Sequence, residues 1–396
     1  MLPFQESNGE LPADDPSEND DPGQPLLDSE ELATILEQAR SSSVTKSISL
    51  AVITGDGAVY TAVANQEGDP YAVTSDMHFS IASCTKTFVA GCVLRLIEDG
   101  SLGLNDTLQT LLYDTGVLKD SFKENIDPRI RVRDLLNHTT GLDDFLGNLY
   151  YYDLLLNVYA LWNPIMTLYY VDEPEYTYDA EHPENNECNY NNTDYILLGL
   201  IIERITRDDI YEVMQEFFLD PLNLTNTFMA GVFPYWGLTW IPGPNAIGFE
   251  PTGDTSTWEK TWIKSSTIVD IDAIALYSST WTSGNMISDS VDMARWIRYY
   301  YRYQEELGYI VDDAFNEASE LSDFFSERKF GYGIEYLKHE SGTELWGHTG
   351  TIVGFNSMVF YMPEQDVSIA ILINDHVIWR WGILHVVVDY VLDKLQ

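Results

Sequence analysis

The feature that most constrains the fold is the presence of strand-like segments at both ends of the chain. Residues 47–64 are rich in β-branched and apolar side chains on either side of a Gly-Asp-Gly turn, which predicts a hairpin. Near the other end, three segments have strand composition: 344–346, 355–362 and 367–373. Because helical patterns lie between the two sets, we expect an α/β (α+β) fold in which both chain ends build one antiparallel sheet.

Helical spacing of apolar residues marks five further segments: 27–39, 85–99, 195–205, 289–301 and 379–395. We expect residues 27–396 to form a single catalytic domain with terminal helices flanking the sheet. Its α/β lobe would comprise residues 27–105 and 321–396, and a mainly helical lobe would occupy residues 106–320. The chain shows no internal repeat.

The charge balance excludes some partners. The chain has 396 residues, 45% of them hydrophobic, and 63 acidic against 21 basic residues give a formal net charge of -42. A nucleic-acid backbone or an anionic membrane surface would repel such a protein, so nucleic acid is not an expected partner. The acidity fits a halophilic protein hydrated in high salt, and equally a mildly saline or extracellular setting.

Residues 6–24 are rich in Asp, Glu, Asn, Ser and Pro and cannot bury enough apolar surface to fold. We therefore expect residues 1–26 to form an acidic disordered tether. No apolar run in the sequence is long enough to cross a bilayer, and the first residues lack the features of a signal peptide. A leader removed before Met1 is a hypothesis from composition alone, and with it we expect an extracytoplasmic location, periplasmic, secreted or tethered.

The cysteines do not predict a disulfide framework. Cys84 and Cys92 lie about 12 Å apart along one predicted helix, too far to pair, and Cys188 is distant in sequence. No Cys/His spacing suggests zinc. We expect neither a metal nor a cofactor.

The tetrad Ser-x-x-Lys occurs three times, at 43–46, 83–86 and 326–329. Only Ser83 and Lys86 open an apolar helix, where residues three apart share a face and the serine lies at the positive end of the helix dipole. Lys86 would then be able to take the proton of Ser83 or change the pKa of a neighbouring base. An N-cap serine beside a surface lysine is the alternative interpretation of this tetrad.

Two further clusters add to this pair. Tyr190, Asn191 and Asn192 precede the predicted helix at 195–205, and a tyrosine beside a lysine can act as a general base because the ammonium favours the phenolate. His348 and Gly350 lie in a Trp-Gly-His-Thr-Gly-Thr run that we place at the end of a strand. Its small residues would let backbone N–H groups approach a substrate carbonyl.

Together and in this order, the three motifs resemble those of the class C β-lactamase and D-alanyl-D-alanine carboxypeptidase family of penicillin-recognising serine hydrolases. The resemblance extends from about Ser47 to Asp375. Four more segments match the family's pattern: 96–107, 130–142, 220–228 and 330–334.

The resemblance implies a role for each matching residue. Ser83 would be the nucleophile, Lys86 and Tyr190 the proton-handling pair, and Asn192 a hydrogen-bond donor to the substrate amide. His348, Thr349 and Gly350 match the third motif, whose threonine helps to bind substrate, and the backbone N–H groups of Ser83 and Thr351 would form the oxyanion hole. The Asn-His-Thr-Thr-Gly segment around His138 is expected to support the fold rather than the chemistry.

One departure from the family concerns the substrate. In the similar carboxypeptidases, the strand that begins Tyr-Gly carries an arginine for the peptide carboxylate, and here that position falls at or near Leu337. Alternation along the strand places Glu335 and Leu337 on one face and Lys338 on the other. We therefore expect β-lactams, esters or amino-bearing substrates rather than a free carboxylate, although a register shift of one residue would make Lys338 the anchor.

The sequence thus predicts a serine hydrolase that works through an acyl-enzyme on amide, β-lactam or ester carbonyls of a small molecule or D-amino-acid peptide. Carboxylesterase or D-amino-acid peptidase activity remains possible within the same family. A binding module that recognises penicillin or peptidoglycan without turnover is the alternative from another class, and a calcium-binding protein lacks the expected Asp-x-Asp-x-Asp-Gly loop.

Overall fold

A computed structural model describes most of the chain. The described residues are 26–43, 45–156, 160–230, 246, 249–252, 254–260, 271–310, 316–317, 324–375 and 380–395. The predicted tether lies outside them except for Leu26. Where the structure describes the chain, no helix has both the length and the apolar character needed to cross a membrane.

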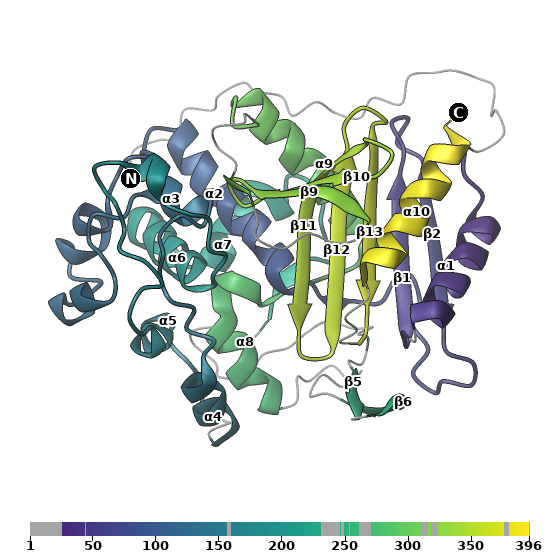
Figure 1. Cartoon of the computed structure of the whole chain (residues 1–396), viewed down its shortest axis with the longest axis horizontal. Coiled ribbons are helices and arrows are strands. Elements are labelled where there is room, and N and C mark those ends of the chain that lie inside the picture. Colours follow the sequence, from purple (N-terminus) through teal and green to yellow (C-terminus); the bar gives the residue numbers. More distant parts are fainter. Residues whose placement is uncertain are drawn as a thin grey trace.

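The central element is an eight-stranded sheet in the order β2-β1-β13-β12-β11-β10-β9-β8 (Figure 1). Its strands are β1 (Ser47–Ile53), β2 (Val59–Asn65), β8 (Asn316–Glu317), β9 (Phe325–Phe330), β10 (Glu335–His339), β11 (Glu344–Ile352), β12 (Phe355–Met362) and β13 (Val367–Ile373). The neighbouring strands pair antiparallel, and Ile48 on β1 lies opposite Ile373 on β13. The prediction of one antiparallel sheet made from both chain ends is confirmed.

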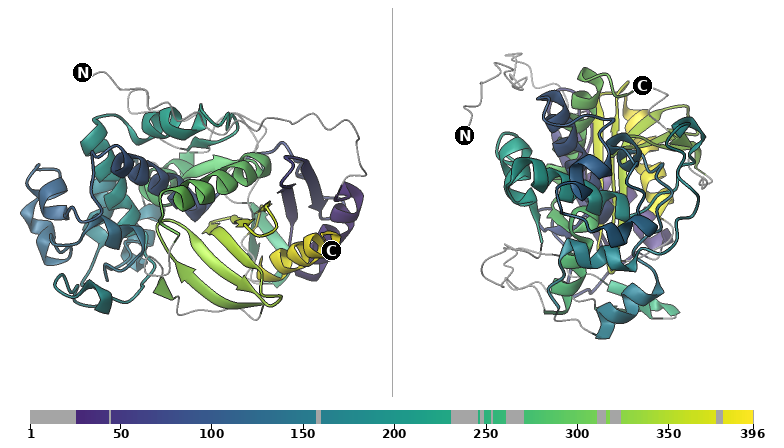
Figure 2. Two further views of the ribbon diagram at one scale, coloured as in Figure 1. Left: turned by 90° about the horizontal axis from the view of Figure 1, so that it is seen from above. Right: turned by 90° about the vertical axis from the view of Figure 1, so that its left-hand side faces the viewer.

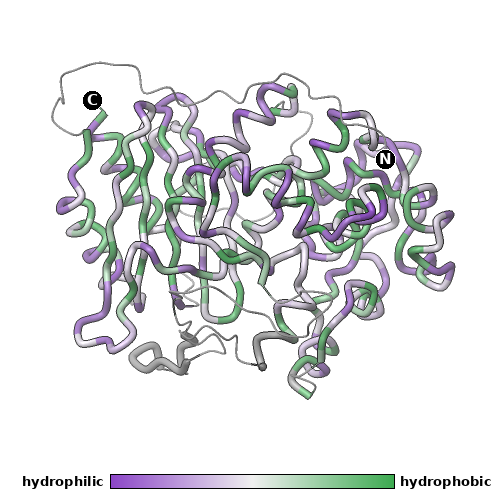
Figure 3. The backbone as a smooth tube through the Cα atoms, turned by 180° about the vertical axis from the view of Figure 1, so that it is seen from behind, coloured by the Kyte–Doolittle hydropathy of each residue, from purple (hydrophilic) through white to green (hydrophobic). Residues whose placement is uncertain are grey.

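Helices cover both faces of this sheet (Figure 2). Helices α1 (Ser29–Ser43) and α10 (Arg380–Lys394) pack together over one face, and α9 (Ser290–Glu306) packs against β1, β12 and β13 on the other. Alternate residues of β12 serve two cores: Met358 and Phe360 lie in the core beside α1 and α10, whereas Val359 lies in the larger one. Figure 3 shows the hydrophobic stretches along these strands that two-sided burial requires.

The remaining helices gather at one end of the sheet (Figure 1). They are α2 (Thr85–Glu98), α3 (Val132–Leu136), α4 (Asn148–Leu156), α5 (Pro164–Thr167), α6 (Thr193–Thr206), α7 (Ile210–Met214) and α8 (Ile271–Gly284). Three short strands, β3 (Phe79–Ser80), β4 (Phe228–Met229) and β7 (Met286–Ser288), form a small sheet beside them, and β5 (Phe249–Thr252) pairs with β6 (Asp254–Lys260). Helix α2 is buried along nearly its whole length.

Helix α8 has a sharp kink near its C-terminus. Trp281 has φ 34° and ψ -121°, far from helical values. The kink packs against α6 at Gly199, where a Cβ would lie 2.6 Å from side-chain atoms of both Trp281 and Thr282. Thr282 Oγ1 also donates a hydrogen bond to the Tyr195 carbonyl at 2.8 Å. The absence of a side chain at Gly199 therefore fixes how the end of α8 approaches α6.

We predict that Gly199→Ala destabilises the fold, although this change usually stabilises a helix interior by roughly 0.5–1 kcal/mol. The new methyl group must displace Trp281 or Thr282, so the free energy of unfolding should fall by about 1–3 kcal/mol, measured by urea denaturation. The matched control is Gly382→Ala inside α10, where the nearest heavy atom to the new Cβ lies 3.8 Å away, an ordinary contact. Equal stability of the two variants would contradict this account of the kink.

Candidate active site

Ser83 lies in a tight 3-10 turn, Ala82–Cys84, that connects β3 to α2. Ala82 adopts a positive φ of 47°, which is unusual for a residue with a side chain. The preceding residue is held on two sides, because the Ile81 N–H donates to Met286 O at 3.0 Å and Ser357 Oγ donates to Ile81 O at 2.8 Å. Ser83 itself is partly exposed between buried neighbours, so the turn presents its hydroxyl to the surface.

Strand β11 passes directly beside this turn because Gly350 has no side chain. A Cβ at Gly350 would lie 2.3 Å from Ile81 O and 2.4 Å from Ser357 Oγ. The placement of the third motif at the end of a strand is corrected here, since β11 continues through His348 and Gly350 to Ile352. Glycine and polar residues are uncommon in strands, so the composition of this segment did not predict the full length of β11.

Lys86 is fully buried one helical turn after Ser83. Its Nζ lies 3.2 Å from Ser83 Oγ, 2.7 Å from Asn192 Oδ1 and 2.7 Å from Ser283 O. The amide and carbonyl oxygens can only accept hydrogen bonds, whereas a hydroxyl can also donate. An ammonium can donate to all three oxygens, and a neutral Lys86 fits this site as well: two N–H groups bond the two acceptors, and the lone pair can accept from the Ser83 hydroxyl.

The electrostatics agree with a neutral lysine. Burial lowers the pKa of Lys86 to about 7, and the nearby carboxylates of Asp144 and Asp194 oppose part of that shift. At neutral pH a large fraction of Lys86 is then without its proton.

Asp144 was not identified from the sequence. Its Oδ2 accepts hydrogen bonds from the Asn192 backbone N–H at 3.3 Å and from Asn192 Nδ2 at 2.8 Å, and burial raises its pKa. One hydrogen of the Asn192 amide is therefore used inside the protein, which leaves one for a substrate. The available signal was the Asp-Asp pair that directly follows the Thr-Thr-Gly-Leu segment.

Tyr190 lies against Lys86, with the lysine Nζ 5.0 Å from the ring centroid. Burial raises the pKa of the Tyr190 phenol far above its usual range, and the hydrogen bond with Ser83 reverses only part of that effect. This burial opposes the expected effect of the neighbouring ammonium, which would favour the phenolate. Tyr190 keeps its proton at neutral pH.

His138 lies beneath Tyr190, with 4.4 Å between the ring centroids. It has a positive φ of 60°, and its Nδ1 bonds Asp194 Oδ2 at 2.9 Å. Burial lowers the pKa of His138 and raises that of Asp194, and the hydrogen-bonded pair supports the tyrosine ring from below.

The third motif faces an ion pair. Glu335 Oε2 accepts hydrogen bonds from the backbone N–H and the hydroxyl of Thr349, both at 3.0 Å, and Glu335 Oε1 accepts from Arg328 Nε at 2.6 Å. Burial lowers the pKa of His348 to about 4, so this histidine is neutral. Its Nδ1 donates to the Thr349 carbonyl at 2.5 Å, which leaves Nε2 as an acceptor.

The strand positions discussed for a substrate carboxylate have different surroundings. Leu337 is buried in the core beside α1 and α10, and Lys338 pairs with Glu327 at 3.3 Å. Arg328, which sequence reasoning missed, lies on β9 directly opposite Leu337. An arginine from the neighbouring strand cannot be found by following one strand along the sequence.

Comparison with known proteins agrees with this architecture. The family model described as Beta-lactamase matches residues 32–378. Protein flp of Staphylococcus aureus strain MW2 is 23% identical over 299 residues, which are 75% of this chain and 52% of that protein, so the chain spans about half the length of the curated relatives it matches.

Among solved structures, a D-stereospecific amidohydrolase from Streptomyces sp. superposes with a TM-score of 0.68 at 23% identity, covering 89% of this chain and 97% of the other. The D-amino acid amidase from Ochrobactrum anthropi SV3 in complex with D-phenylalanine gives 0.67 at 20% identity, with 92% and 98% covered. A penicillin binding protein from Bacillus halodurans gives 0.63 at 17% identity, with 89% and 98% covered. These likenesses confirm the fold, and the match of the family model across most of the sequence shows that the chain belongs to the beta-lactamase family.

Proposed function

We propose that this protein is a serine hydrolase that forms an acyl-enzyme on Ser83. The observation that carries the proposal is the contact of 3.2 Å between Ser83 Oγ and the buried Nζ of Lys86. A lysine whose pKa is lowered to about 7 can act as a general base at neutral pH, whereas an ordinary surface lysine cannot.

In the first half of the reaction, the neutral Lys86 takes the Ser83 proton and Oγ attacks the substrate carbonyl carbon. The carbonyl π electrons move onto oxygen, and the backbone N–H groups of Ser83 and Thr351 would stabilise that oxyanion. Thr351 is at the exposed end of β11, where this strand passes the Ser83 turn. The proposal thus assigns the oxyanion hole to two adjoining segments of backbone.

Collapse of the intermediate requires a proton for the leaving group. Tyr190 keeps its phenolic proton because of burial, so it donates to the leaving nitrogen or oxygen and is reprotonated by the Lys86 ammonium. Water then attacks the ester, gives its proton to Lys86, and releases Ser83 by the reverse path. Protons balance across the two halves.

The charges around the third motif favour uncharged acyl groups. Arg328 is paired with Glu335, and His348 is neutral. These residues beside the third motif therefore provide no net positive charge to bind a free carboxylate. We propose amides first, including D-amino-acid amides, because solved structures of the same fold include a D-amino acid amidase and a D-stereospecific amidohydrolase. Esters and β-lactams follow, and carboxypeptidase action is the least favoured.

The first test is covalent labelling with a fluorescent penicillin and, in parallel, a fluorophosphonate probe. We expect one label per chain by intact-mass measurement and none in Ser83→Ala. The matched control is Ser326→Ala, which removes an exposed serine from another Ser-x-x-Lys tetrad and should label normally. Labelling that persists in Ser83→Ala would refute the assigned nucleophile, and a label that stays for hours without product release would favour a binding module.

The pH dependence follows from Lys86. Below its pKa the ammonium cannot accept the Ser83 proton, so activity is lost as pH falls and is gained as pH rises. We expect kcat/KM for a D-amino-acid amide to increase with a midpoint at about 7 and to remain level at higher pH while Tyr190 keeps its proton. A profile that is flat between pH 5.5 and 9 would contradict Lys86 as the base.

Asp144 provides a second test of the same base. Its carboxylate raises the pKa of Lys86, so Asp144→Asn should move the midpoint of the pH profile to lower pH while keeping an acceptor for Asn192. The control is Asp153→Asn, which changes an exposed carboxylate bonded to the Tyr170 hydroxyl and should leave the midpoint in place. A shift to higher pH in Asp144→Asn would overturn this electrostatic account.

A further inference from the structure

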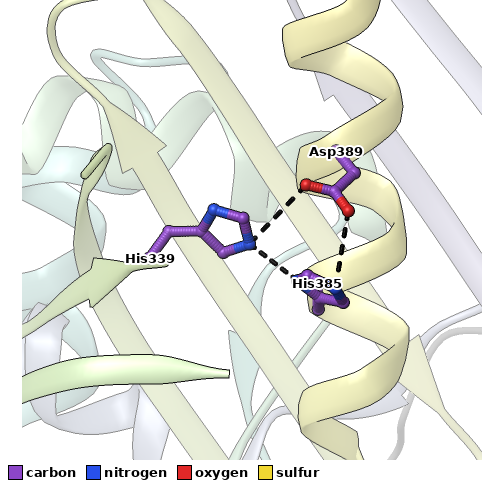
Figure 4. Close-up of side chains that lie close together, drawn as sticks. All are labelled: His339, His385 and Asp389. Carbon is purple, nitrogen blue, oxygen red and sulfur yellow. Dashed lines mark hydrogen bonds and ion pairs between the residues drawn. The ribbon is translucent and has the colours of Figure 1, made fainter. Parts of the chain in front are cut away.

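A second cluster of ionisable side chains lies where the end of β10 meets α10 (Figure 4). His339 is the last residue of β10, and His385 and Asp389 lie one turn apart on α10. His339 Nε2 is 2.7 Å from His385 Nδ1 and 3.8 Å from Asp389 Oδ1. His385 Nε2 is 3.4 Å from Asp389 Oδ2. The proposed chemistry at Ser83 uses none of these groups.

These separations approach those of metal ligands. Bonds of 2.0–2.1 Å in a tetrahedral zinc site place neighbouring ligand atoms ~3.3 Å apart. Both imidazole-to-carboxylate separations, 3.4 and 3.8 Å, lie close to that value. The contact of 2.7 Å between the histidines is too short for both of those nitrogens to bind one ion, so His385 would bind through Nε2, and the hydrogen bond between the two rings would break when His339 Nε2 binds the ion. That nitrogen also lies 3.8 Å from Glu340 Oε1.

The surroundings of His339 orient its ring for such a role. Its Nδ1 is 2.8 Å from Ser341 Oγ, and the Ser341 hydroxyl donates its own hydrogen to Thr343 Oγ1 at 3.0 Å. The Ser341 backbone N–H also donates to Nδ1 at 3.3 Å, so in the absence of an ion the ring proton lies on Nε2, the nitrogen that faces the cluster. A bound cation would displace that proton, as metals do when they bind a histidine.

The charges also suit a dication. Asp389 and Glu340 are 54% and 64% exposed, so they provide two negative charges and a path from solvent. Two imidazoles with carboxylates prefer zinc-like transition metals over magnesium or calcium, which favour oxygen ligands.

We propose that His339, His385 and Asp389 bind a divalent transition-metal cation of the zinc class, with Glu340 within reach as a fourth ligand. The ion would connect α10 to the end of β10, on the face of the sheet that α1 and α10 cover. The competing arrangement is a hydrogen-bonded chain from His339 through His385 to Asp389, which needs no ion. The two arrangements predict different responses to zinc.

The test uses the full chain, stripped with a chelator and titrated with ZnCl₂ in a calorimeter. Excess MgCl₂ in the buffer occupies the acidic surface, so weak binding by exposed carboxylates is suppressed. We expect one saturable Zn²⁺ per chain and a higher Tm with zinc than without it. Cobalt(II) in place of zinc should give visible absorption bands of a tetrahedral site.

Variants of the two ligands on α10 make the assignment specific. His385→Gln and Asp389→Asn should each weaken zinc binding at least tenfold and remove the rise in Tm, while probe labelling at Ser83 is unchanged. The control is His182→Gln, which changes an exposed histidine 3.5 Å from Glu184. Absence of saturable binding, or equal affinity in His385→Gln and the control, would overturn the metal site and leave the hydrogen-bonded chain.

Discussion

The burial of one amine, that of Lys86, is the constraint on which the candidate site depends. A fully buried lysine is costly unless its hydrogen bonds are satisfied, and here the acceptors come from Asn192, directly before α6, and from the kinked end of α8. Both helices must therefore be in place before the lysine is tolerated. The same burial brings its pKa into the range where a base is useful, so the cost to stability and the proposed reactivity have one cause.

A second constraint is how closely backbone segments approach one another around Ser83. Gly350 brings β11 against the serine turn, and Gly199 admits the kink of α8 to α6. Neither glycine has a Cβ, and an added side chain would push apart elements that each carry part of the site. These two contacts between distant segments of the chain therefore help to bring together the third motif, the lysine and its acceptors.

Much of the fold was predictable because its signals are local. Strand composition in β1, β12 and β13 and the apolar repeat of α2 follow from burial alone, and the family motifs identified Ser83, Lys86 and Tyr190 as residues that should meet. Asp144, Arg328 and Ser283 were not predictable. Each acts through a contact between distant elements, and Ser283 does so through its backbone carbonyl. The protonation of Tyr190 depends on its burial, which a sequence motif does not report.

The pairing of the first strand with the last has a consequence for how the protein acquires its shape. Lys46 and Asp375, whose backbone N–H and carboxylate are hydrogen-bonded, are 329 residues apart in the chain. On the ribosome the N-terminal hairpin therefore emerges long before its neighbour β13 has been synthesised, and one of its edges waits without a partner. Such distant pairing slows folding and exposes apolar strands to aggregation, so a nascent chain of this kind would benefit from protection by a chaperone until its final segment is released.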